Sequence, residues 1–330
     1  MKSLTQHISE KLVLNNNSKI RKQEYNYHPK TLTELRDTMY KLIDERGDNA
    51  DLNDIDVSNI VTLEGLFREF DTFNGDISQW DVSNVLTMTD TFAVSDFTGD
   101  ISQWDVSNVT TMQRMFHNSE FNGDISNWDV SSVENMTDMF NGSKFNGNLN
   151  KWDVSNVKLM SGMFGESTFE GDISNWNVKE VIHMDYMFED NMVWDGDISK
   201  WNVSNVISMR CMFHDSGFTG KYGSIKNWNV EKVRDAQLMF AGSEFNGDLS
   251  GWKLKNAINI RSMFLRSSFN NDSIKDWNKY LNSVRNMNYM FSETKFSQDL
   301  SHWTIDKQCD VSGMFDDCPI KEEYKPTVKK

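Results

Sequence analysis

Aspartates recur at a fixed interval along the chain, and they are the residues best placed to bind a partner. Each directly follows a tryptophan or the residue in its place, and asparagine takes over later in the chain: Asp56, Asp81, Asp105, Asp129, Asp153, Asn177 and Asn202. Carboxylates aligned about 5 Å apart repel one another, so solvent, backbone amides, cations or a basic partner must offset the charge. We therefore expect these residues to form a face that binds a basic protein surface.

Two other roles for the aspartates remain open. Each carboxylate can cap the turn that follows it, which is a structural role. A ladder of calcium ions is a weaker alternative, because calcium prefers six to eight oxygen ligands and the repeat lacks the glycine-rich pattern of calcium-binding rolls. We expect no bound metal.

The other reactive side chains do not form a catalytic pattern. Two of the six histidines, His117 and His214, occupy the same position of repeats that are four copies apart, too distant to share a substrate. Glycine-rich phosphate loops and the H-E-x-x-H zinc motif are absent from the sequence. The cysteines are either three free thiols or include a Cys309–Cys318 disulfide, with Cys211 left over. We expect no enzymatic activity and no cofactor.

An internal repeat of about 24 residues positions the aspartates. Its consensus is F-N-G-D-I-S-x-W-D-V-S-N-V-x-x-M-x-x-M-F-x-x-S-x, and residues 121–144 form a clear copy among about eleven. Burying one tryptophan removes about 200 Å² from water, which is worth up to about 5 kcal/mol. We therefore expect a stabilising aromatic ladder, which includes Trp80, Trp104, Trp128, Trp152, Trp176, Trp201, Phe116 and Phe140.

Each repeat combines two periodicities. Trp80 and Val82 alternate with polar residues, which is typical of a short strand, and stacked strands pair in parallel at about 4.8 Å. Val109, Met112 and Phe116 fall on one stripe, which predicts a short helix. The sequence thus predicts an α/β fold: a solenoid of about eleven 24-residue coils, with a parallel strand face and short helices.

The two ends of the chain differ from the repeats. Residues 1–50 lack the repeat, but apolar residues between positions 32 and 43 form a helical stripe, opened by Thr31 and Glu34 in capping-box spacing. We expect an N-terminal helical cap or docking segment at 1–50, the repeats at 51–318 and a flexible tail at 319–330. Residues 1–14 are either a short docking helix or frayed, and residues 15–22 look like a linker.

Charge and hydropathy exclude some partners. The 330 residues have a formal net charge of −15, which opposes binding to nucleic acid and to anionic membrane surfaces. Apolar runs are too short for a signal peptide or for membrane insertion. We expect no nucleic-acid partner and synthesis in a cytoplasm, with incorporation into a particle or release by lysis left open.

The motif D-I-S-x-W-D-V-S-N-V-x-x-M-x-x-M-F resembles the BspA-like bacterial surface repeat, a relative of leucine-rich repeats (LRRs) that is also known as domain of unknown function 285. The resemblance covers about residues 50–318. It implies an LRR-like solenoid whose strand face binds proteins. It also implies an asparagine ladder in which buried amides join adjacent turns: Asn59, Asn84, Asn108, Asn156 and Asn205.

Two functions follow from these features. The first is a non-enzymatic, adhesin-like repeat scaffold that recognises a protein partner through its open strand face, and the resemblance favours it. The second is a structural component of a larger assembly, namely a virion or decoration protein of a phage that infects gut bacteria, docked by the N-terminal segment. The missing signal peptide favours this second function or an intracellular binder.

Overall fold

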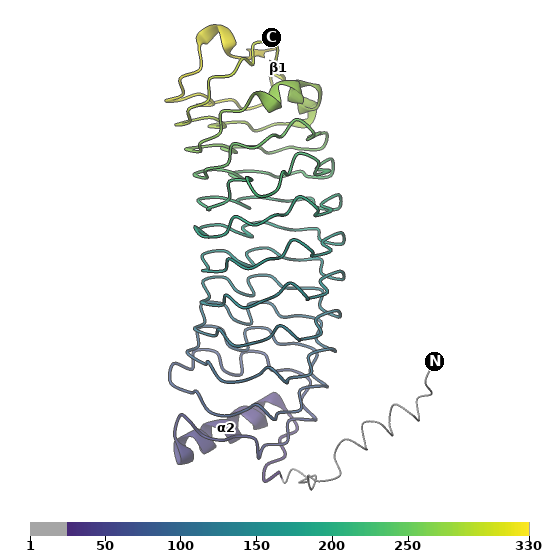
Figure 1. The fold of residues 1–330 in the computed structure, drawn as a ribbon, viewed down its shortest axis with the longest axis vertical. Coiled ribbons are helices and arrows are strands. Elements are labelled where there is room, and N and C mark those ends of the chain that lie inside the picture. The colour runs from purple at the N-terminus through teal and green to yellow at the C-terminus, as the bar shows by residue number, and fades with distance from the viewer. Residues whose placement is uncertain (1–24, 330) are drawn as a thin grey trace, which may run out of the picture.

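Successive repeats lie side by side along one axis, so that the chain forms a column of stacked coils (Figure 1). The computed structural model describes residues 25–329, and the docking helix or frayed end and the linker expected within residues 1–22 lie outside that range. Helix α2 (Leu32–Arg46) lies at the N-terminal end of the column, and the last residues lie at the other end. No helix within residues 25–329 is long and apolar enough to cross a membrane.

Regular secondary structure is sparse in the described residues. After α2, the chain forms only three short 3-10 helices and two strands: η1 (Asp272–Lys279), η2 (Leu281–Ser283), β1 (Thr304–Ile305), η3 (Glu322–Tyr324) and β2 (Thr327–Val328). The strands β1 and β2 pair in parallel. Isolated parallel bridges also connect neighbouring coils, one residue pair at a time, along a single column from Thr62 to Asp310.

The backbone of each coil differs from the predicted short strand and short helix. From residue 51 to residue 271 the described chain contains neither element. The predicted stripe of Val109, Met112 and Phe116 is fully buried, but its backbone is a succession of turns. Within it the Met115 amide donates to the Met112 carbonyl, whereas the next amide, that of Phe116, donates to Met139 in the following coil. An α-helix would keep all of these amides within one coil, so it could not link the stack.

Residues in the left-handed conformation allow successive amides to bond alternately within their own coil and to the following coil. Arg114 and Asn118 have φ angles of 55° and 50°, and every coil repeats such a pair, four positions apart. We call residues 112–118 and their equivalents the linking segment. Seventeen of the left-handed residues in the linking segments within residues 25–329 are not glycine. Each costs about 1–2 kcal/mol relative to a right-handed conformation. The hydrogen bonds and packing between coils must offset this cost.

Aromatic stacks form the core of the column. Eleven phenylalanines, from Phe67 to Phe315, form one continuous stack with neighbouring ring centroids 5.0–5.8 Å apart. The ladder tryptophans are also buried, and each donates from Nε1 to a backbone carbonyl of the preceding coil, as Trp128 does to Ile101 at 3.1 Å. All eight residues expected in the ladder are at most 4% exposed. Trp194, the one tryptophan outside the frame, stacks on Phe188 of this stack and on Phe218 of the following coil, with ring centroids 3.9 and 6.0 Å apart.

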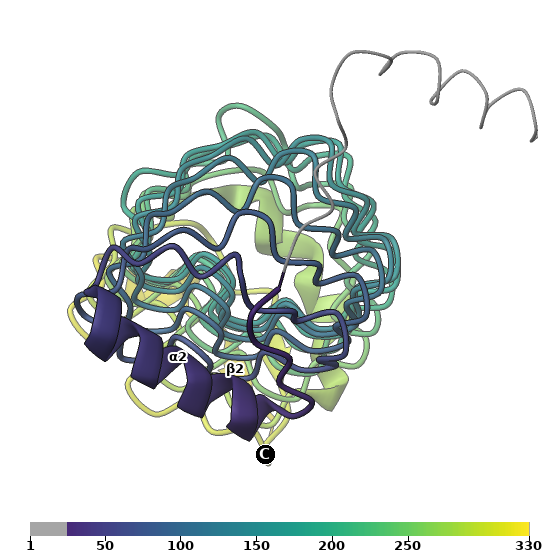
Figure 2. The ribbon, with the colours of Figure 1, turned by 90° about the horizontal axis from the view of Figure 1, so that it is seen from below.

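Helix α2 lies across one side of the N-terminal end of the column, as Figure 2 shows from that end. It begins where the capping residues predict, since the Thr31 hydroxyl accepts a hydrogen bond from the Glu34 amide at 3.2 Å. Its apolar side chains Leu35, Met39 and Leu42 are at most 1% exposed. These contacts bury the face that the sequence pattern identified.

We expected a flexible tail at residues 319–330, and its described residues, 319–329, contain regular structure. Its residues form η3 and β2, and β2 pairs Thr327 with Thr304 and Val328 with Ile305. Polar composition suggested flexibility, but backbone hydrogen bonds to the last coil do not depend on apolar side chains. The amide of Thr327, for example, donates to the carbonyl of Trp303 at 3.0 Å.

Candidate protein-binding surface

The predicted aspartates lie in one row, one in each successive coil. We call Asp81, Asp105, Asp129 and Asp153 the acidic row, and all four are exposed. Asp56 precedes the row and is partly covered, whereas Asn177 and Asn202 continue it as exposed neutral residues. The buried tryptophan and valine on either side of each aspartate force the polar residue between them outward.

Each aspartate is held by the residues that follow it. In Asp129, Oδ1 accepts from the amide of Ser131 at 3.1 Å and from its hydroxyl at 2.6 Å. Asp81 and Asp105 make the same pair of bonds with Ser83 and Ser107. These hydrogen bonds from serine hold the pKa of Asp129 below its ordinary value. The Asp129 carboxylate is therefore ionised at neutral pH, and the same hydrogen bonds give Asp81 and Asp105 the same orientation.

The turn role that the sequence left open is thus present in the structure. Asn177 and Asn202 take the same part, since their side-chain oxygens accept from the amides of Lys179 and Ser204 at 3.4 and 3.2 Å. Because asparagine also makes the turn, the turn alone does not require a negative charge. The turn uses only Oδ1 of each carboxylate. The Oδ2 atoms of Asp81, Asp105 and Asp129 therefore have no hydrogen-bond partner among residues 25–329.

Basic partners are unevenly distributed along this face. Asp56 contacts His28 at 3.2 Å, but no ion pair links any member of the acidic row to a basic residue within the described chain. Further along, Lys255 lies 2.9 Å from Glu231, and Lys226 lies 2.8 Å from Asp248. The hydrogen bond from Lys226 lowers the pKa of Asp248 to about 2. The members of the acidic row therefore have no basic partner among the described residues, whereas Glu231 and Asp248 in the later coils each have one.

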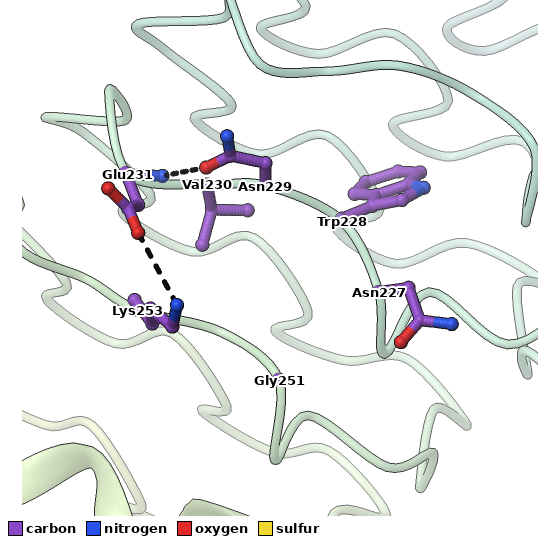
Figure 3. A pocket seen from close by; sticks show the side chains of 7 residues that line it. All are labelled: Asn227, Trp228, Asn229, Val230, Glu231, Gly251 and Lys253. Carbon is purple, nitrogen blue, oxygen red and sulfur yellow. Dashed lines mark hydrogen bonds and ion pairs between the residues drawn. The ribbon is translucent and has the colours of Figure 1, made fainter.

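A shallow hollow interrupts the face beyond the acidic row (Figure 3). It has a volume of about 270 Å³, and it is lined by Asn227, Trp228, Asn229, Val230, Glu231, Gly251 and Lys253. Gly251 replaces the longer polar residue that precedes the tryptophan in other coils, and a Cβ there would lie 2.2 Å from the Lys226 carbonyl oxygen. The hollow was not predicted from the sequence, although a glycine in place of a polar residue was a visible signal.

The asparagine ladder links neighbouring turns beside the acidic row. Asn108 Nδ2 donates to the Ser83 carbonyl at 2.8 Å, and Asn156 Nδ2 donates to the Ser131 carbonyl at 2.7 Å. The bonds are those that the resemblance implied, but the side chains are exposed and not buried. They lie at the surface because the following valine, for example Val109, takes the interior position.

The histidines, cysteines and acidic residues within residues 25–329 form neither a metal site nor a disulfide. No group of three or more histidine, cysteine or acidic residues within residues 25–329 is arranged to hold a metal ion. All three cysteines are free, so the Cys309–Cys318 disulfide is not formed. Burial raises the pKa of the Cys211 thiol to about 12 and that of Cys309 to about 11, which keeps both protonated.

The family comparison agrees with the repeat that the residues define. The family model described as "Mycoplasma protein of unknown function, DUF285" matches residues 37–146, 117–222, 141–244 and 216–325. The chain belongs to this family. Successive DUF285 matches overlap, since a short repeat aligns with the same model in several frames. Comparisons with curated proteins and with solved structures found no match.

Proposed function

We propose that this DUF285 protein is a non-enzymatic scaffold, an LRR-like solenoid that binds a protein partner with a basic surface. One observation carries the proposal: Asp81, Asp105, Asp129 and Asp153 are exposed, evenly spaced and without a basic partner among the described residues. Aligned like charges are unfavourable unless a partner or solvent compensates them. A basic surface whose charges have the same spacing would form a favourable charge contact with every coil along the row.

The repeat supports recognition by shape as well as by charge. Because the aromatic core fixes each coil against its neighbours, the row is held rigid before any partner arrives. A preorganised surface loses little conformational entropy on binding. The BspA-like resemblance is consistent with such a role, since it implies a protein-binding face.

The test compares two variants that lose the same charge. The first replaces Asp81, Asp105 and Asp129 by asparagine, which keeps the turns because asparagine already makes them in later coils. The control replaces Glu120, Glu166 and Glu244 by glutamine, which are exposed acidic residues outside the row. Wild type and both variants are immobilised, and the proteins captured from a producing culture are quantified at low and high salt.

We expect a basic protein that the wild type and the glutamine control retain at low salt. The asparagine variant should lose it, because charge pairing at the interface is removed. Equal capture by both variants would show that only net charge matters. Unfolding of the asparagine variant in circular dichroism would show that the aspartates are structural. Either result contradicts the proposal.

A further inference from the structure

Within the linking segment the hydrogen bonds between coils all run in one direction, although elsewhere in the coil the Thr110 amide and the Trp128 indole donate to the preceding coil. In the linking segment, four amides of each coil donate to four carbonyls of the following coil, and this pattern holds at all ten interfaces between the coils of Phe67 and Phe315. Met112 and Phe116, for example, donate to Asn135 and Met139. The two ends of the column therefore differ: one end presents carbonyl acceptors, and the other presents amide donors.

The donors of the last coil are open. The amides of Val311, Gly313, Phe315 and Asp317 have no hydrogen-bond acceptor within residues 25–329, and we call them the donor row. Phe315 is partly exposed, whereas the ten phenylalanines that precede it in the stack are buried. Beside the row lies a mainly apolar groove of about 200 Å³, whose lining includes Ile305, Val311, Met314, Phe315, Pro326 and Val328.

The acceptors of the first coil lie beside α2, which contacts the row at the Glu64 carbonyl. The carbonyls of Thr62, Glu64, Leu66 and Arg68 form the acceptor row, equivalent to the carbonyls that accept at every later interface. Helix α2 packs beside them, where Tyr40 stacks on Phe70 and Arg36 donates to the Glu64 carbonyl at 3.3 Å. Leu63, Leu66 and Phe67 are consequently fully buried.

Because the donor row contains only amide donors, few kinds of backbone edge can bind to it. A second donor row would place amides against amides, and an ordinary strand edge alternates donors with acceptors, so that half of its groups would not match. An acceptor row matches every position and extends an interface that the chain already forms ten times. We propose that the donor row binds the acceptor row of a second copy of this chain, and that α2 controls this stacking by its place beside the acceptor row.

The experiment first removes α2 from the acceptor row and then disrupts the surface beside the donor row. The variant Leu35→Asp with Met39→Asp should release α2, because both side chains are buried beneath it. We expect wild type to sediment as a monomer, and the open variant to form assemblies whose mass rises with concentration. Adding Phe315→Asp to the open variant should abolish them. The matched control, Ile258→Asp, changes an exposed apolar residue on the side of a coil and should not.

A folded open variant that stays monomeric, or assemblies that survive Phe315→Asp, would overturn the proposal. Amide hydrogen exchange provides an independent measurement on the wild type. The donor row should exchange at nearly the rate of an unstructured peptide, and protection by more than about a hundredfold in the monomer would contradict an open row.

Discussion

Replacing Trp128 by alanine tests whether the aromatic ladder stabilises the column. The side chain is 4% exposed, packs against Phe116 at 6.4 Å between ring centroids, and donates to the Ile101 carbonyl. Its burial is worth up to about 5 kcal/mol. Losing the indole also leaves that carbonyl without its donor, which costs about 1–3 kcal/mol. Partial collapse of the cavity offsets some of this, so we expect a loss of about 3–5 kcal/mol in the free energy of unfolding.

The assay is guanidinium unfolding followed by circular dichroism, together with amide exchange in residues 121–144. Exchange is needed because a repeat array can lose one region before the rest unfolds. Trp128→Phe keeps an aromatic ring but removes the donor, and it should cost about 1–3 kcal/mol. Leu86→Ala, at a position that is 50% exposed, should change stability by less than about 0.5 kcal/mol. A loss below about 1 kcal/mol for Trp128→Ala would refute the ladder as a source of stability.

Three other properties can be checked with simple measurements. Val94→Gly should stabilise the protein by about 0.5–1 kcal/mol in denaturant melts, because Val94 has a φ of 52°, whereas the reverse change Gly142→Val should destabilise it. Cys211 should resist a thiol reagent at pH 8 in the native state and react after unfolding, and rapid native labelling would contradict its raised pKa. Because the pKa of Asp248 is lowered to about 2, its contribution to stability is complete above pH 4 and is lost as pH falls toward 2. Lys226→Met should therefore make the loss of stability between pH 4 and pH 2 shallower, and an unchanged slope would contradict the assigned ion pair.

The features that burial determines could be predicted from the sequence. The apolar positions of the repeat, such as Met112 and Phe116, are interior residues, and the stripe that begins at Leu32 forms α2. The outward placement of Asp105 also follows from its neighbours Trp104 and Val106. In these cases residue type alone separates the interior from the surface.

The features that hydrogen bonds between coils determine could not be predicted. Apolar residues three and seven positions apart indicate a helix in isolation, but the same spacing suits consecutive turns when alternate amides bind the next coil. Tyr186, Cys211 and Leu238 adopt positive φ angles that none of these residue types favours. The hydrogen bonds from Ser131 to Asp129 likewise depend on turn geometry that the periodicity did not reveal.

The direction of bonding in the linking segment also bears on how the chain folds during synthesis. A ribosome releases the N-terminal residues first, so α2 and the first coil can assemble before later repeats exist. Each completed coil then presents the four linking amides to a partner only about 24 residues further along the chain. Every new coil can thus form its hydrogen bonds with the linking amides of a coil that has already folded. Folding can keep pace with translation from one end to the other, without waiting for distant segments to meet.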